Sequence, residues 1–165
     1  MTLTADLRSV WFSLHELRDM VLPLRLLVNE DIPESPAPQP VQALGDRLDD
    51  VFGRLQEAID ALGPVLDDQS NEPVRSALAR THRAMLDFAH EWSAEISAHH
   101  RLAPVTRSAV ERGPAWRVWA KSTVENVQGC ETVRHRVDLN LLACWQTLAE
   151  IADQPPRPSY ATKEL

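Results

Sequence analysis

Apolar residues recur every three or four positions along most of this 165-residue chain, which is the spacing of amphipathic helices. The first such segment is predicted at residues 4–28. Pro23 lies inside it and removes one backbone donor, so we expect a kink between Asp19 and Pro23. The apolar stripe of this segment is Leu3, Leu7, Val10, Leu14, Leu17, Val21, Leu24 and Val28.

A second helix is predicted at residues 41–62, after a proline-rich linker at residues 31–40. Four of the ten linker residues are proline, so a helix cannot continue through them. Gly63 and Pro64 end or bend the second helix. Its apolar stripe is Val41, Leu44, Leu48, Val51, Leu55, Ala58 and Leu62.

A third helix is expected to begin at Ser70 or Asn71, because either side chain can cap a helix N-terminus. It is expected to end near His99. Residues 101–113 then form a predicted loop, with at most a short helical segment at residues 105–112. The apolar stripe of the third helix is Val74, Leu78, Thr81, Met85, Phe88, Trp92 and Ile96.

The last periodic segment, residues 114–151, is unusually long. At 1.5 Å per residue it spans roughly 57 Å, against about 35 to 40 Å for each of the other helices. Either its beginning projects beyond the other helices, or it breaks near Gly129, a weak helix residue, and residues 114–128 fold back over the preceding loop. The seam of this segment is Trp116, Ala120, Thr123, Val127, Cys130, Arg134, Val137, Leu141, Cys144, Leu148 and Ile151.

These segments predict an all-α protein, an up-down-up-down four-helix bundle with one unusually long C-terminal helix. A chain of 165 residues can bury one sizeable core, so residues 1–152 are predicted to form a single domain that includes the proline-rich linker at 31–40. The polar, proline-rich tail at residues 153–165 is predicted to be disordered.

Charge and hydropathy exclude several classes of function. The formal net charge is −7, which argues against a nucleic-acid partner. No apolar run is long enough to cross a membrane, and Asp6 interrupts the first apolar residues, so we expect neither a membrane span nor a secretory signal. Cys130 and Cys144 would lie roughly 21 Å apart on one helix and cannot bridge. We therefore expect a cytoplasmic protein.

Candidate metal ligands lack a convincing pattern. Glu95 with His99, and Glu131 with His135, place a carboxylate and an imidazole one helical turn apart. Di-iron bundles instead use Glu-x-x-His, so the spacing differs by one residue. No metal site and no cofactor are predicted. A three-histidine site has no spacing signature either, and its members would be His15, His82 and His90.

Candidate catalytic residues are also missing from the pattern. Cys130 and Cys144 fall on the seam of the last helix, where burial raises the pKa of a thiol and suppresses its nucleophilicity. Arg134 occupies a seam position as well, and it either pairs with Glu57 or Asp60 across the bundle or extends to the bundle edge. No catalytic residue is predicted.

Two tryptophans stand at the start of the last helix, behind Gly113 and Pro114. Trp116 and Trp119 lie on one helical face, and they either fill the core or form an exposed patch that binds a partner. The predicted partner-binding residues are Trp116, Trp119, Arg117 and Lys121.

The last third of the chain carries two short motifs, a Gly-Pro followed by W-x-x-W at residues 113–119 and C-W-x-x-L-A-E at residues 144–150. In these motifs the chain resembles the CATRA-associated small proteins, which are all-helical companions of caspase-like peptidases and repeat proteins in bacterial conflict systems. The resemblance covers residues 105–152. It implies a non-enzymatic accessory or effector protein that acts with a peptidase partner in defence, and it transfers no catalytic residue.

The sequence therefore predicts a helical protein-interaction module. Its partner would be a protein, such as a caspase-like peptidase or a repeat protein, and association into a homodimer stays open. Two other candidate surfaces are the acidic face of the second helix and the linker segment at residues 32–40, which is either a docking segment or a cleavable loop. The alternative is a metal- or small-ligand-binding four-helix-bundle enzyme.

Overall fold

The computed structural model of the chain is all-helical over the residues it describes, which are 3–34, 36–66, 71–92, 96 and 102–153. This part of the chain contains no strand, and none of its helices combines the length with the hydropathy that a membrane span requires. The elements are α1 (Leu3–Asn29), α2 (Gln39–Leu62), the short 3-10 helix η1 (Gly63–Val65), α3 (Asn71–Glu91), α4 (Leu102–Val110) and α5 (Pro114–Asp153).

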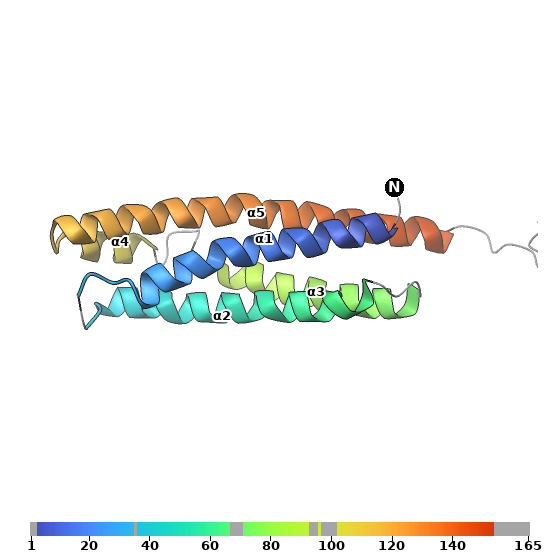
Figure 1. Cartoon of the computed structure of the whole chain (residues 1–165), viewed down its shortest axis with the longest axis horizontal. Coiled ribbons are helices and arrows are strands. Elements are labelled where there is room, and N and C mark those ends of the chain that lie inside the picture. Colours follow the sequence, from blue (N-terminus) through green and yellow to red (C-terminus); the bar gives the residue numbers. More distant parts are fainter. Residues whose placement is uncertain (1–2, 35, 67–70, 93–95, 97–101, 154–165) are drawn as a thin grey trace, which may run out of the picture.

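The helices lie side by side along one axis, as Figure 1 shows. α1 packs against both α2 and α5, α2 also packs against α3, and α4 packs against α5 and α2. The chain reverses direction from α1 to α2, from α2 to α3 and from α4 to α5, whereas α3 and α4 follow each other in the same direction (Figure 1). As a result α3 and α4 accompany different parts of the long helix α5.

α5 is longer than the other helices, and it stays unbroken because α3 and α4 lie beside different parts of it. The helix is continuous through Gly129, so the alternative with a break near this residue is wrong. A Cβ atom at Gly129 would lie 2.7 Å from Cε of Met20 on α1, which means that glycine here permits a close approach of two helices. The short helical segment predicted at residues 105–112 is present as α4, which has nine residues and begins three residues earlier, at Leu102.

Most other helix boundaries match the sequence pattern closely. α1 continues through Pro23 as a helix, and α2 begins at Gln39 because Pro40 fits the first helical turn. α3 begins at Asn71, and Ser70, the other predicted cap, lies outside the described residues. The predicted end of the third helix at His99 and the tail beyond Asp153 lie outside the described residues.

The turn between α4 and α5 depends on Gly113. Its φ angle is +126°, a conformation that residues with a Cβ atom rarely adopt. The glycine lets the chain reverse immediately before Pro114, the first residue of α5. α4 is thereby folded back alongside the beginning of α5.

The predicted apolar stripes meet in one core cluster. Every position of the α1, α2 and α3 stripes whose burial is described is buried, and so are the described positions of the α5 seam apart from Arg134. The largest fully buried side chains are Trp92, Phe88, Leu14, Leu17, Leu24, Leu44, Leu48, Leu55, Leu62, Leu78, Ile96 and Val10.

Polar side chains fix the register of α1 against α5. The Thr147 hydroxyl donates to the carboxylate of Asp6 at 2.7 Å, and the Asn140 amide donates to the hydroxyl of Ser13 at 2.7 Å. Asp6 and Ser13 are both buried, so loss of either partner would leave a polar group unsatisfied. These two bonds favour one register of the antiparallel pair over a one-turn slip.

Candidate interaction surfaces

The tryptophan pair at the start of α5 belongs to the core. Trp116 is 3% exposed and Trp119 is 4% exposed, and their ring centroids lie 5.4 Å apart in an edge-to-face arrangement. The Trp119 indole nitrogen donates to the backbone carbonyl of Leu27 at 2.7 Å, which ties α5 to the end of α1. The exposed indole patch that a projecting helix would create is therefore not formed.

The two cations beside this pair lie on the surface. Arg117 and Lys121 are exposed and line a shallow groove between α4 and α5, of about 370 Å³. Lys121 lies 3.9 Å from the carboxylate of Glu125, one turn further along α5. Of the four predicted partner-binding residues, only these two are accessible. The remaining lining residues are Thr106, Val110, Ala120, Val124 and Glu125.

The proline-rich linker is docked against its own molecule over its described residues. Ile32 and Ala37 are partly buried against the core. The Gln42 amide donates to the carbonyl of Ala37 at 2.6 Å, and Glu34 forms an ion pair with Arg112, next to the α4–α5 turn. The linker between α1 and α2 therefore contacts the α4–α5 turn at the same end of the bundle.

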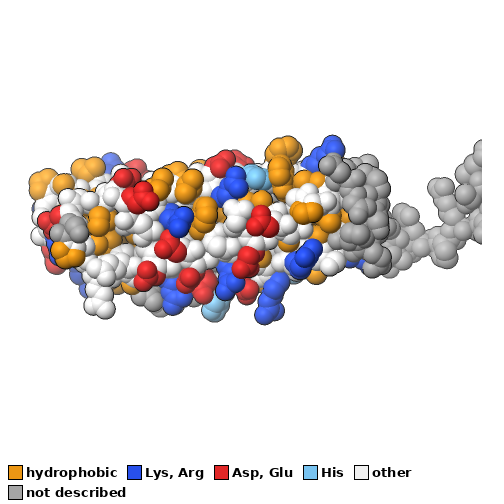
Figure 2. All heavy atoms as spheres, turned by 60° about the horizontal axis from the view of Figure 1, so that its bottom comes forward, with side chains coloured by type: hydrophobic (Ala, Val, Ile, Leu, Met, Phe, Trp, Pro, Cys, Tyr) orange, Lys and Arg blue, Asp and Glu red, His pale blue; other side chains and the backbone are white. Residues whose placement is uncertain are grey.

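The face formed by α2 and α3 carries mixed charge. Figure 2 shows acidic and basic side chains interspersed over the side of the molecule that it displays. Two acids at α2 are paired with arginine. Asp49 on α2 lies 2.6 Å from Arg25 on α1, and Glu91 on α3 lies 2.8 Å from Arg47 on α2. Pairing lowers the negative potential that the acidic composition of this segment predicts.

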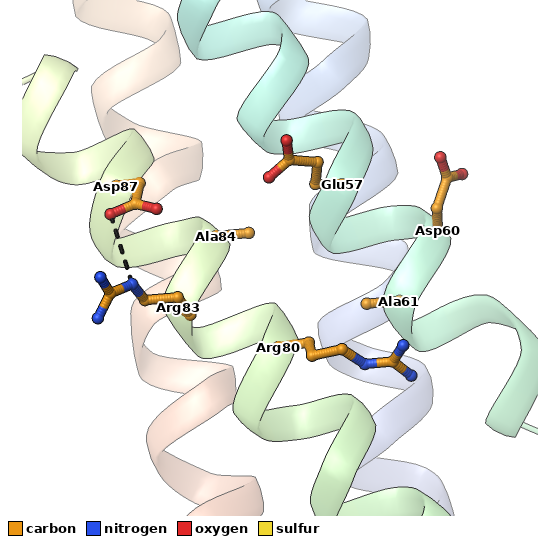
Figure 3. Close-up of a pocket in the computed structure, with 7 residues that line it drawn as sticks. All are labelled: Glu57, Asp60, Ala61, Arg80, Arg83, Ala84 and Asp87. Carbon is orange, nitrogen blue, oxygen red and sulfur yellow. Dashed lines mark ion pairs between the residues drawn. The ribbon is translucent and has the colours of Figure 1, made fainter.

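A shallow groove of about 480 Å³ separates α2 from α3. Figure 3 shows Ala61 and Ala84 between walls of charged side chains, with Arg83 beside Asp87 on α3 at 3.8 Å. Glu57 and Asp60 lie on the opposite wall. These charges are of both signs and open to solvent, which is typical of a hydrated surface rather than of a catalytic cluster.

A groove of different character separates α3 from α5, and it measures about 320 Å³. Leu86 on one rim is 54% exposed and Leu142 on the other is 53% exposed. Buried Met85 and Leu141 lie deeper, and Trp145 is partly buried. The sequence interpretation missed this groove. The full lining is His82, Met85, Leu86, Ala89, Asp138, Leu141, Leu142 and Trp145.

One part of the groove is polar. Arg134 donates to Oδ2 of Asp138 at 3.0 Å, and burial raises the pKa of Asp138 although Arg134, His135 and His82 act in the opposite direction. The His82 ring lies 6.0 Å from the Trp145 ring, centroid to centroid. The groove therefore combines an apolar strip with one partly desolvated carboxylate.

The partner of Arg134 differs from the predicted ones. Its guanidinium pairs with Asp138 on the same helix and not with Glu57 or Asp60, because a residue four positions along lies one turn away. Glu57 pairs with Arg54 instead, at 3.2 Å. Arg134 is only partly exposed, and its Nε atom is buried without a hydrogen-bond acceptor among the described residues.

The thiols are poorly suited to nucleophilic chemistry. Burial raises the pKa of Cys130 to about 12 and that of Cys144 to about 12. A thiol with such a pKa is almost entirely protonated near neutral pH, and the thiolate is the nucleophilic form.

The described residues contain no cluster of three or more His, Cys, Asp or Glu side chains that could hold a metal ion. Within the Glu131/His135 pair, no third ligand joins the two side chains in this part of the chain. The other predicted pair, Glu95 and His99, lies outside the described residues.

Compared with protein-family models, with curated proteins and with solved structures, the chain shows no match.

Proposed function

We propose that this chain is a non-enzymatic helical interaction protein, an accessory or effector component of a bacterial conflict system that acts with a peptidase partner. The single observation that carries the interaction role is the α3/α5 groove, whose leucine rims are about half exposed to water. Side chains of this kind at a groove between two helices are typical of surfaces that become buried on association.

The finer architecture supports the same proposal. We interpret α3 and α4 as two successive parts of one side of an up-down-up-down four-helix bundle, with α5 as the long last helix. The two motifs that resemble the CATRA-associated small proteins lie at the two ends of α5, and most of their large side chains are buried. The resemblance thus concerns residues that build the bundle, and it suggests the peptidase partner.

The exposed and buried groups favour association over catalysis. The thiols are buried with raised pKa values, and the charged groove between α2 and α3 presents solvated ion pairs. Beside α5, the groove with α3 instead presents two leucines that are about half exposed, and the groove with α4 includes Val110 and Val124. The net charge of −7 makes a protein a more suitable partner than a nucleic acid.

The proposal is tested by co-expressing the full chain with a caspase-like peptidase or repeat protein from its own genome. Size-exclusion chromatography with light scattering should show a complex of defined stoichiometry. Leu86→Glu and Leu142→Glu should each weaken this complex, because a buried carboxylate is costly in an apolar contact. Stoichiometric iron, manganese or zinc in untagged protein would contradict the proposal and favour the metal-binding enzyme.

A further inference from the structure

The α3/α5 groove has the length of a short helix. Its lining runs from His82 to Ala89 on α3 and from Asp138 to Trp145 on α5. Each of these spans covers seven steps of 1.5 Å, so the groove is roughly 10 Å long, which is about two helical turns. A segment of this length contacts the groove with two or three side chains on one face.

The walls of the groove favour a helical occupant. Both walls are α-helices, and within them the backbone N–H and C=O groups are bonded along the helix. An extended peptide would find no backbone partners there and would place its own amides over an apolar floor, at a cost for each unpaired group. A helix that extends beyond the two contacting turns bonds the backbone of those turns internally, and it presents only side chains to the groove.

The apolar lining sets the anchors of this occupant. Leu86 and Leu142 flank the groove from opposite helices, and Ala89 leaves room beside them. The flexible side chain of Met85 can adapt to different aliphatic groups. Two aliphatic side chains three or four residues apart, on one face of the incoming helix, match a groove of two turns.

The polar part of the groove sets the charge of the occupant. Asp138 supplies the one charged side chain of the lining, and its hydrogen bond from Arg134 uses only the Oδ2 atom. Covering this carboxylate would desolvate it further, so a facing cation near its Oδ1 atom is favoured over a facing carboxylate. Titratable or charged groups that face Asp138 are Arg134 and His135 on its own helix and His82 on α3.

We propose that the α3/α5 groove binds a two-turn amphipathic helix of a partner protein, which presents two aliphatic side chains one turn apart and a Lys or Arg placed to reach Asp138. This inference rests on the proposed interaction role and specifies the partner segment. A second copy of the chain and a small ligand are the competing occupants.

A helical-peptide selection tests the proposal directly. A phage-displayed library of amphipathic helical peptides is selected on the full chain, and enriched peptides are measured by fluorescence anisotropy. The enriched sequences should carry aliphatic pairs spaced by three or four residues and a basic residue about one turn further on. No enrichment, or enrichment of acidic residues at that position, overturns the proposal.

Matched variants locate the binding. Leu142→Glu should weaken binding about tenfold or more, since it places a charge at an anchor site. Leu139→Glu is the control, because Leu139 is 54% exposed on the same helix but does not line the groove. The control should change the Kd by less than about twofold. Equal effects of the two variants overturn the proposed location.

A double-mutant cycle tests the charge. Replacing the basic residue of the peptide by Gln should weaken binding to the natural chain by about three- to tenfold, and should have little further effect on Asp138→Asn. Independent effects of the two changes contradict the assigned contact. Circular dichroism of each variant establishes that it is folded.

Two outcomes separate this inference from the proposed function. If helical peptides bind the groove but no complex forms with a peptidase or repeat protein, the partner assignment fails and the groove stands. If a complex forms and Leu142→Glu leaves it intact, the groove assignment fails and the interaction role stands. If the free chain is a dimer that Leu142→Glu converts to a monomer, a second copy fills the groove and the helix proposal is overturned.

Discussion

Trp119 is expected to be a stability residue, and Trp119→Ala is the change that tests this. The indole is almost fully buried, and its nitrogen donates to the Leu27 carbonyl. Truncation of a buried tryptophan to alanine costs about 3 to 5 kcal/mol, which includes the cavity left behind. The lost hydrogen bond contributes about 1 kcal/mol of this. A domain of this size has a total stability of about 5 to 15 kcal/mol, so the loss is large.

Urea denaturation followed by circular dichroism measures the effect. With a slope of about 2 kcal/mol per molar urea, the midpoint of Trp119→Ala should fall by about 1.5 to 2.5 M. Trp119→Phe keeps most of the aromatic volume and should show a much smaller fall, because it removes the donor and only part of the ring. The matched control is Val118→Ala, since Val118 is 68% exposed on the same turn, and its stability should change by less than about 0.5 kcal/mol.

The result that refutes this reasoning is specific. If Trp119→Ala retains the midpoint of the natural chain and instead loses a bound partner, the indole contacts the partner and is not part of the core. If Val118→Ala destabilises as strongly as Trp119→Ala, the assigned orientation of this turn of α5 is wrong.

Three further changes follow from the packing and the titration of particular groups. Gly45→Ala should change the free energy of unfolding by less than about 0.5 kcal/mol in urea denaturation, because a Cβ atom 2.2 Å from Oδ1 of Asn29 makes this side chain swing away and lose its exposed hydrogen bond to Asp49, while alanine gains about as much in helix propensity; a loss well above 1 kcal/mol would show that Asn29 cannot move aside. Cys130 and Cys144 should react with a disulfide reagent near neutral pH only after unfolding, because burial raises the pKa of each thiol to about 12; fast labelling of the folded chain, followed by absorbance, would contradict this burial. Burial raises the pKa of Asp138 above its ordinary value of 3.8. The folded state therefore binds the proton of this carboxyl group more tightly than the unfolded state does. Protonation stabilises the fold at low pH, and this contribution is lost as the pH rises from 3.8 through the folded-state pKa. Asp138→Asn should remove this loss, so the change in urea midpoint across that range should be more positive for the variant than for the natural chain; an identical pH dependence would refute it.

The sequence predicts the helices well because burial of an apolar stripe is a periodic, local property. Leu14, Leu48 and Phe88 occupy positions that any helix must turn toward its neighbours, and all three are buried. The inward orientation of Cys130 and Cys144 follows from the same spacing.

The features that the sequence did not predict depend on contacts between distant segments. The sequence left open whether the last helix breaks near Gly129, a weak helix residue, and the close approach of Met20 to this glycine is a contact that no local pattern reveals. The packing of α4 against α5 and α2 likewise joins segments that are distant in the sequence.

The candidate groove could not be located from periodicity alone, although a signal for it exists. Leu86 and Leu142 are leucines outside the predicted stripes, and Leu139 is a third. The sequence does not show which of these share a surface, since that depends on how α3 lies beside α5. The structure places two of the three across one groove and leaves Leu139 outside it.

The unbroken rod of α5 has a mechanical consequence. It is about 60 Å long, it forms one wall of the groove with α4 near its beginning, and it forms one wall of the groove with α3 nearer its end. A ligand that tilts this rod on binding at one groove changes the width of the other. Binding in the groove with α4 would then change the affinity of the groove with α3 for its ligand. Thermodynamic reciprocity requires binding in the groove with α3 to change the affinity of the groove with α4 by the same factor.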